Sequence, residues 1–137
     1  MGKSDRIRLP GHTTMNVEEL RELCISKKGV TEEFPFDEST LVFKVMGKMY
    51  ALSGLTSWEN GEPRINLKCD PEEAVLLREQ YPESVLPGYH MNKQHWNTVV
   101  LNGELTTKEL KEFIDHSYAL IVSSLTKKLK EELKRLD

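Results

Sequence analysis

Stretches in which hydrophobic and polar residues alternate predict the β-strands of this chain. Residues 41–46 and 49–53 flank a Gly47-Lys48 turn, which predicts two antiparallel strands. In 64–69 the alternation is complete, so one face of the predicted strand is apolar and the other is polar. The apolar set, expected in the core, is Ile65, Leu67 and Cys69, and the outward set is Arg64, Asn66 and Lys68. Residues 85–91 predict a short extended piece, and 96–101 predict another strand.

Hydrophobic residues repeated at helical spacing predict three helices. Their ranges are about 16–28, 71–81, and from 107 to the C-terminus, with an interruption near 123–124 in the last. Each follows a residue type that caps helix N-termini, namely Asn16, Asp70 and Thr106. Between the helices and strands, 32–37 is expected to be an ordered connector and 54–63 a polar loop.

The predicted order is therefore α-β-β-β-α-β-β-α. Neighbouring strands joined by short turns favour an antiparallel sheet with its helices on one side, which is a two-layer α+β domain. We expect a five-stranded sheet, with one face open to solvent. Residues 15–137 are expected to form this single domain. Residues 1–14 lack any periodicity and resemble an irregular expression leader.

The composition is that of one acidic domain. The 137 residues hold 19 Lys and Arg against 22 Asp and Glu, a net charge of −3. Without the first fourteen residues the balance is 16 basic against 21 acidic side chains, or −5. No apolar run approaches the length of a membrane span, so we expect a soluble, cytoplasmic protein. Cys24 and Cys69 stand in different elements and are expected to be buried free thiols, although one disulfide is an alternative.

The segment from Pro87 to Thr98 is the part of the chain richest in chemically active side chains. His90 and His95 are five residues apart, a spacing that fits neither a helical zinc pair nor a C/H finger. No nucleophile with a recognisable elbow accompanies them, and no glycine-rich phosphate loop is present. We therefore expect no metal, cofactor or catalytic residue. The alternatives are local hydrogen bonding by the histidines, or a small-molecule or enzymatic site where His90, Lys93 and His95 converge.

A basic patch is the other candidate site. Lys44, Arg64 and Lys68 share the outward side of the predicted strands, and the neighbouring segment brings further side chains to them. These are His90, Lys93 and Trp96. Lysine and arginine contact nucleic-acid phosphates, and Trp96 or the loop residue Trp58 could stack on a base. The ordinary alternative is a solvated sheet face, which commonly carries such residues.

Several segments together resemble one known family. They are Glu33-Phe34-Pro35-Phe36, the strand pair 41–45 and 47–51, Asn66-Leu67-Lys68-Cys69-Asp70-Pro71, the segment 87–98 (PGYHMNKQHWNT), and Ser117-Tyr118. The chain resembles the MmcQ/YjbR family from about Met15 to Lys130. One departure is Thr126, where the family often has a proline.

The resemblance implies a secretion-chaperone-like α+β fold and a non-enzymatic, DNA-binding role without a cofactor. Our leading hypothesis is thus phosphate-backbone binding to DNA by the residues of the basic patch. The alternative is a protein-interaction module, either chaperone-like or self-pairing, in which an open face or edge strand takes an extended peptide.

Overall fold

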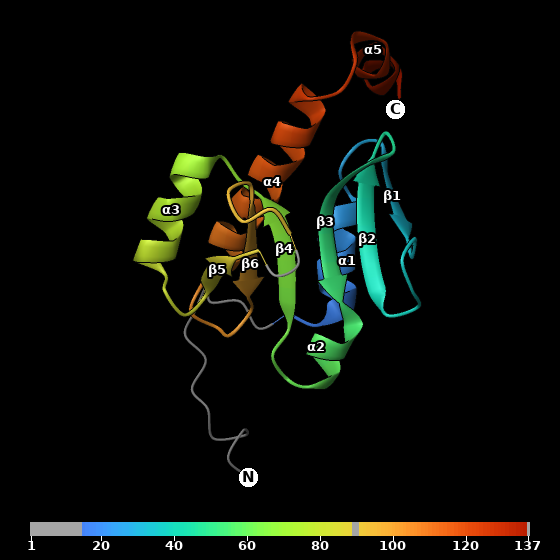
Figure 1. Ribbon diagram of the computed structural model, residues 1–137. Helices are drawn as coiled ribbons and strands as arrows, with labels where there is room; N and C mark the ends of the chain where they lie inside the picture. The colour runs from blue at the N-terminus through green and yellow to red at the C-terminus, as the bar shows by residue number, and fades with distance from the viewer. Residues whose placement is uncertain (1–14, 89–90, 137) are drawn as a thin grey trace.

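A six-stranded antiparallel sheet forms the centre of the molecule (Figure 1). The computed structural model describes residues 15–88 and 91–136, so the predicted leader lies outside the described residues. The strands are β1 (Val30–Glu33), β2 (Thr40–Val45), β3 (Lys48–Gly54), β4 (Arg64–Lys68), β5 (Val85–Pro87) and β6 (Trp96–Val100). The helices are α1 (Val17–Ile25), α2 (Leu55–Glu59), α3 (Pro71–Gln80), α4 (Thr107–Ser123) and α5 (Lys127–Arg135). The strands lie in the order β1-β2-β3-β4-β6-β5.

The predicted α+β class is confirmed, but the count of five strands is wrong. Strand β1 occupies part of the expected connector and adds the sixth strand at the sheet edge. Its sequence, Val-Thr-Glu-Glu, has no apolar alternation because an edge strand needs little burial. Helix α2 likewise forms inside the expected polar loop, where its five residues are too few to show a helical period.

The predicted caps are confirmed, and the interruption of the last helix has a visible cause. Asn16 and Thr106 each close a capping box with the glutamate three residues on, and Asp70 accepts from two backbone amides of α3. After α4 ends, Thr126 caps α5 by accepting from the Leu129 amide at 3.2 Å. The predicted interruption therefore coincides with a threonine cap that starts a new helix.

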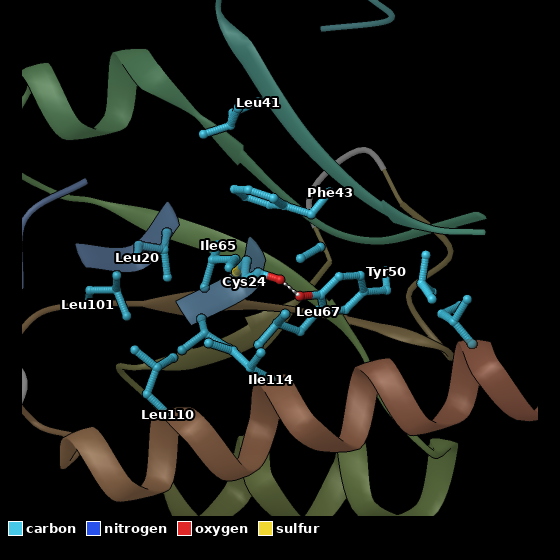
Figure 2. Close-up of a cluster of buried hydrophobic side chains, with 14 of the residues drawn as sticks. Leu20, Cys24, Leu41, Phe43, Tyr50, Ile65, Leu67, Leu101, Leu110 and Ile114 are labelled. Atoms are coloured by element: carbon cyan, nitrogen blue, oxygen red, sulfur yellow. Dashed lines mark hydrogen bonds between the residues drawn. The ribbon is translucent and has the colours of Figure 1, made fainter. Parts of the chain in front are cut away.

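Helices α1 and α4 pack on one face of the sheet. In Figure 1 the sheet lies in front of these two helices. The core between these layers is drawn in Figure 2, with Leu20 and Cys24 from α1, Phe43 and Tyr50 from the sheet, and Ile114 from α4. The ring of Tyr50 is fully buried, and its hydroxyl donates to the Cys24 carbonyl oxygen at 2.6 Å. The helical layer and the sheet are thus joined by a buried hydrogen bond as well as by apolar packing.

Both cysteines are buried and free, as predicted. Burial raises the pKa of the Cys24 thiol to about 12 and that of the Cys69 thiol to about 11. A thiol with so high a pKa stays protonated near neutral pH, so neither is poised as a nucleophile. In the described part of the chain, no helix has the length and hydropathy needed to cross a membrane.

The junction between β3 and β4 divides the sheet into two halves. These strands pair only at Ala51 with Leu67 and at Leu52 with Asn66. On one side of this short ladder, the buried Ser117 hydroxyl of α4 accepts from the Lys68 amide at 2.9 Å and donates to the Tyr50 carbonyl at 2.6 Å. A helix side chain therefore replaces the ladder where the strands separate.

Candidate nucleic-acid interface

The second face of the sheet carries the side chains predicted to point outward. In β4 the alternation is confirmed, because Ile65 and Leu67 are buried whereas Arg64, Asn66 and Lys68 are partly exposed. The neighbouring strand β6 is buried at all five positions, including Thr98, which is paired with Asn66. The accessible polar part of this face therefore follows β4, and we call Arg64, Asn66 and Lys68 the β4 strip.

Two of the predicted phosphate-binding cations already have acidic partners. Lys44 on β2 lies 3.1 Å from a carboxylate oxygen of Glu33, on the adjacent strand β1. Arg64 lies 3.2 Å from a carboxylate oxygen of Glu62. The bond from Lys44 also helps to lower the pKa of Glu33, after a larger effect of the Thr31 hydroxyl. These exposed pairs weaken the positive potential at Lys44 and Arg64 without removing the side chains from solvent.

Lys68 and Lys93, unlike Lys44 and Arg64, have no acidic partner in the described structure. Neither has an acidic partner within 4.0 Å among residues 15–88 and 91–136. Lys68 is paired across the sheet with Trp96, and Lys93 precedes Trp96 by three residues in the turn that leads into β6. Lys93 is exposed, and its ammonium group donates to the Gly88 carbonyl at 3.3 Å. The structure thus brings two cations without carboxylate partners to the same end of the β4–β6 pair.

The aromatic candidates are less accessible. Trp96 is 9% exposed, which leaves little of its ring for stacking on a base. Trp58 of α2 packs against the core, and its indole N–H donates to the Ser53 hydroxyl at 2.9 Å. His90 lies outside the described residues. The described side chains of this face can therefore contact phosphates, but they provide no accessible aromatic ring for stacking on a base.

Close packing constrains Gly88 and Trp96, which lie on either side of the turn before β6. The Gly88 amide donates to the Trp96 carbonyl at 2.9 Å, and a Cβ at Gly88 would lie 2.8 Å from the Trp96 Cβ. On the other side, Arg78 of α3 donates to the Asn97 side chain at 2.8 Å and to the backbone carbonyl of Lys93. Sequence reasoning missed Arg78, because no local spacing links it to a turn fifteen residues later.

A hollow of about 540 Å³ opens on the same face, between β4 and α2. Leu52, Asn66 and Thr98 form a row across three strands beneath it, and Arg64 and Glu62 form one side. The hollow could not be predicted from the sequence, because four of its nine lining residues come from α2, which was not predicted, and from the loop after it. In the described ranges, no group of three or more His, Cys, Asp or Glu residues could hold a metal ion.

Fold and surface together define a two-layer α+β domain with a polar strip and hollow on the sheet face opposite the packed helices. The model of the family described as YjbR matches residues 25–120, which include β1 to β6 and the Pro87–Trp96 segment. The chain therefore belongs to the YjbR family, as the resemblance of its motifs suggested.

Relatives of known sequence and structure support this membership. Uncharacterised protein YjbR of Escherichia coli strain K12 is 34% identical over 122 residues, which cover 89% of this chain and all of that protein. Uncharacterised protein YbdF of Escherichia coli O157:H7 is 42% identical over 95 residues, covering 69% of this chain and 75% of that protein. The crystal structure of Deinococcus radiodurans protein DR2400, with domain DUF419, is 39% identical and has a TM-score of 0.79. That similarity covers 93% of this chain and 92% of the solved one.

Proposed function

We propose that this protein is a non-enzymatic DNA-binding protein that contacts the phosphate backbone through one end of its second sheet face. The observation that carries the proposal is the pair Lys68 and Lys93, two cations without a carboxylate partner in the described structure. A cation without a partner can neutralise a phosphate and release its counterion at no cost in broken ion pairs.

The geometry of β4 extends this contact to a second point. Arg64 and Lys68 share one face and are four residues apart, which is about 13 Å along a strand. Phosphates of one strand of duplex DNA rise about 3.4 Å per step, so the β4 strip spans roughly four steps. Lys44 and Arg64 can bind a phosphate only after their ion pairs with Glu33 and Glu62, respectively, are broken. Binding should therefore depend mainly on Lys68 and Lys93.

The expected salt dependence follows from the number of phosphates contacted. Neutralising two to four phosphates of B-DNA gives a slope of log K against log salt of about −1.8 to −3.6. Affinity for a labelled duplex should thus fall about 10-fold to 150-fold between 50 and 200 mM salt. The contacts involve the backbone, so duplexes of unrelated sequence should bind with similar affinity.

Fluorescence anisotropy with Lys68→Glu and Lys93→Glu tests the proposal. Each substitution should weaken duplex binding at about 50 mM salt and reduce the salt slope by about one. Lys108→Glu, at an exposed position in the first turn of α4, is the matched control, because it changes net charge equally on the helical layer. Absence of binding at low salt, or equal losses for Lys108→Glu and Lys68→Glu, would refute the proposal.

Self-pairing through exposed aromatic side chains is the second candidate, and one observation favours it. Phe34 and Phe36 in the loop between β1 and β2 are 49% and 67% exposed. Pairing through the β5 edge is disfavoured, because the outward amide of Val85 donates to Tyr81 and Pro87 has no amide hydrogen. Light scattering distinguishes the candidates: a dimer that Phe36→Ser converts to a monomer, without loss of fold, supports self-pairing.

A further inference from the structure

The hollow beside Asn66 and Arg64 of the β4 strip presents two side chains that can donate hydrogen bonds. The Oδ1 atom of Asn66 accepts from the Thr98 hydroxyl at 2.5 Å, which leaves the amide N–H groups of Asn66 for another partner. No acceptor for these two N–H groups is found among the described residues. Arg64 adds a positive guanidinium group to the side of the hollow. The hollow therefore suits a ligand that is anionic and carries several acceptor atoms.

One carboxylate stands beside this donor set and must be displaced by such a ligand. Glu62 lies 3.2 Å from Arg64, but 72% of the Glu62 side chain is exposed to solvent. Exposed pairs of this kind contribute at most about 1 kcal/mol, so a phosphate can compete for the guanidinium group. Arg64 is thereby available to an anion, although less readily than Lys68.

The spacing of the donors matches one nucleotide. Arg64 and Asn66 lie on the same face of β4, two residues and so about 7 Å apart. Leu52 stands opposite Asn66 on β3 and forms part of the floor of the hollow; 7% of it is exposed, so it bounds the base and offers it little contact area. The volume of about 540 Å³ lies within the range of pockets that bind small ligands.

We infer that this hollow receives one unstacked nucleotide of a single DNA strand, with its phosphate on Arg64 and its base against Leu52 and the Asn66 amide. The inference rests on the proposed DNA binding and adds strandedness to it. A base in a duplex is stacked and paired, and entering a pocket costs the energy of flipping it out. A single strand pays little of that cost, so it binds more tightly than a duplex.

The test compares three labelled DNAs of equal length by anisotropy at about 50 mM salt: a single strand, the same strand with abasic sites throughout its centre, and a duplex. The intact strand should bind about fivefold more tightly than the other two, since the net contribution of one hydrogen bond from the Asn66 amide to the base corresponds to roughly that factor. Asn66→Leu should remove the advantage of the intact strand over the abasic strand. Gln80→Leu, an exposed amide at the end of α3, is the matched control.

A second variant guards against a misleading loss through misfolding. Glu62→Gln removes the carboxylate that competes for Arg64, so it should raise affinity for the intact strand by about twofold or more. Equal affinity for intact and abasic strands, or no effect of Asn66→Leu and Glu62→Gln, overturns the inference. Backbone binding that still depends on Lys68 would then leave the proposed function standing. No binding of any of the three DNAs would overturn both.

Discussion

Replacing Ser117 tests whether one helix side chain joins the two halves of the sheet. Its hydroxyl is fully buried, accepts from the Lys68 amide and donates to the Tyr50 carbonyl. Ser117→Ala leaves this donor and this acceptor without partners at the point where β3 and β4 separate. The alanine methyl group adds nothing that could replace them, and the small volume change creates no substantial cavity.

The expected loss can be worked out from these two groups. An unsatisfied buried donor or acceptor costs about 1–3 kcal/mol, and the better helix propensity of alanine returns roughly 0.5 kcal/mol. With both groups left unsatisfied, the free energy of unfolding should therefore fall by about 1.5–5.5 kcal/mol. For a domain of this size that corresponds to a decrease in Tm of roughly 5–20 °C.

Urea unfolding and thermal melts of Ser117→Ala and Ser123→Ala provide the assay. Ser123 is exposed near the end of the same helix, and its hydroxyl donates to the Leu120 carbonyl at 2.8 Å, so its loss exposes no buried group. Amide exchange at Lys68 should also be faster in the Ser117 variant. If the two variants differ by less than about 0.5 kcal/mol, the hydroxyl does not support the junction and the reasoning is wrong.

Three further substitutions test other parts of the fold by the same unfolding measurements. Gly29→Ala places a Cβ at a φ of 76° and 2.6 Å from Leu133 Cδ1, so it should cost about 1–2 kcal/mol, and a neutral result would contradict the assigned backbone geometry. Gly88→Ala forces the backbone of Trp96 away and should cost about 1–3 kcal/mol; unchanged stability would show that the segment is looser than described. The pKa of the Cys24 thiol is about 12 in the folded protein, against 9.0 in the unfolded chain. The thiol's contribution to the free energy of unfolding is therefore complete below pH 9 and is lost between pH 9 and 12, by at most about 1.4 kcal/mol per pH unit. Cys24→Ala should flatten that decline, and an identical alkaline profile would exclude the thiol as its cause.

Much of the local structure could be predicted from the sequence because it depends on neighbours along the chain. Caps such as Asn16 and Thr106 bond to amides three residues away, and the alternation in β4 reflects the pleat of a single strand. Strand β1 was missed because its place at the edge is stabilised by partners elsewhere. Its Glu32 bonds to Arg21 of α1, which lowers the pKa of the Glu32 carboxyl.

At the candidate site, too, local features could be predicted from the sequence, whereas contacts between distant residues could not. Parity along β4 correctly placed Arg64 and Lys68 on one face, but only the fold could show that Glu62 and Glu33 accompany two of the predicted cations. It also revealed that Trp96 is mostly buried. Strandedness and affinity for DNA stay predictions, and the experiments above address them.

The sequence by itself determined the class of the domain, the positions of its caps and turns, and which side chains share each strand face. These features follow from periodicity and from hydrogen bonds between residues close in the chain. The tertiary structure decided which cations keep a carboxylate partner, how Ser117 bridges β3 and β4, and where the hollow forms. Such features depend on the distances between groups that only folding brings together, and electrostatic and hydrogen-bond energies change steeply over those distances.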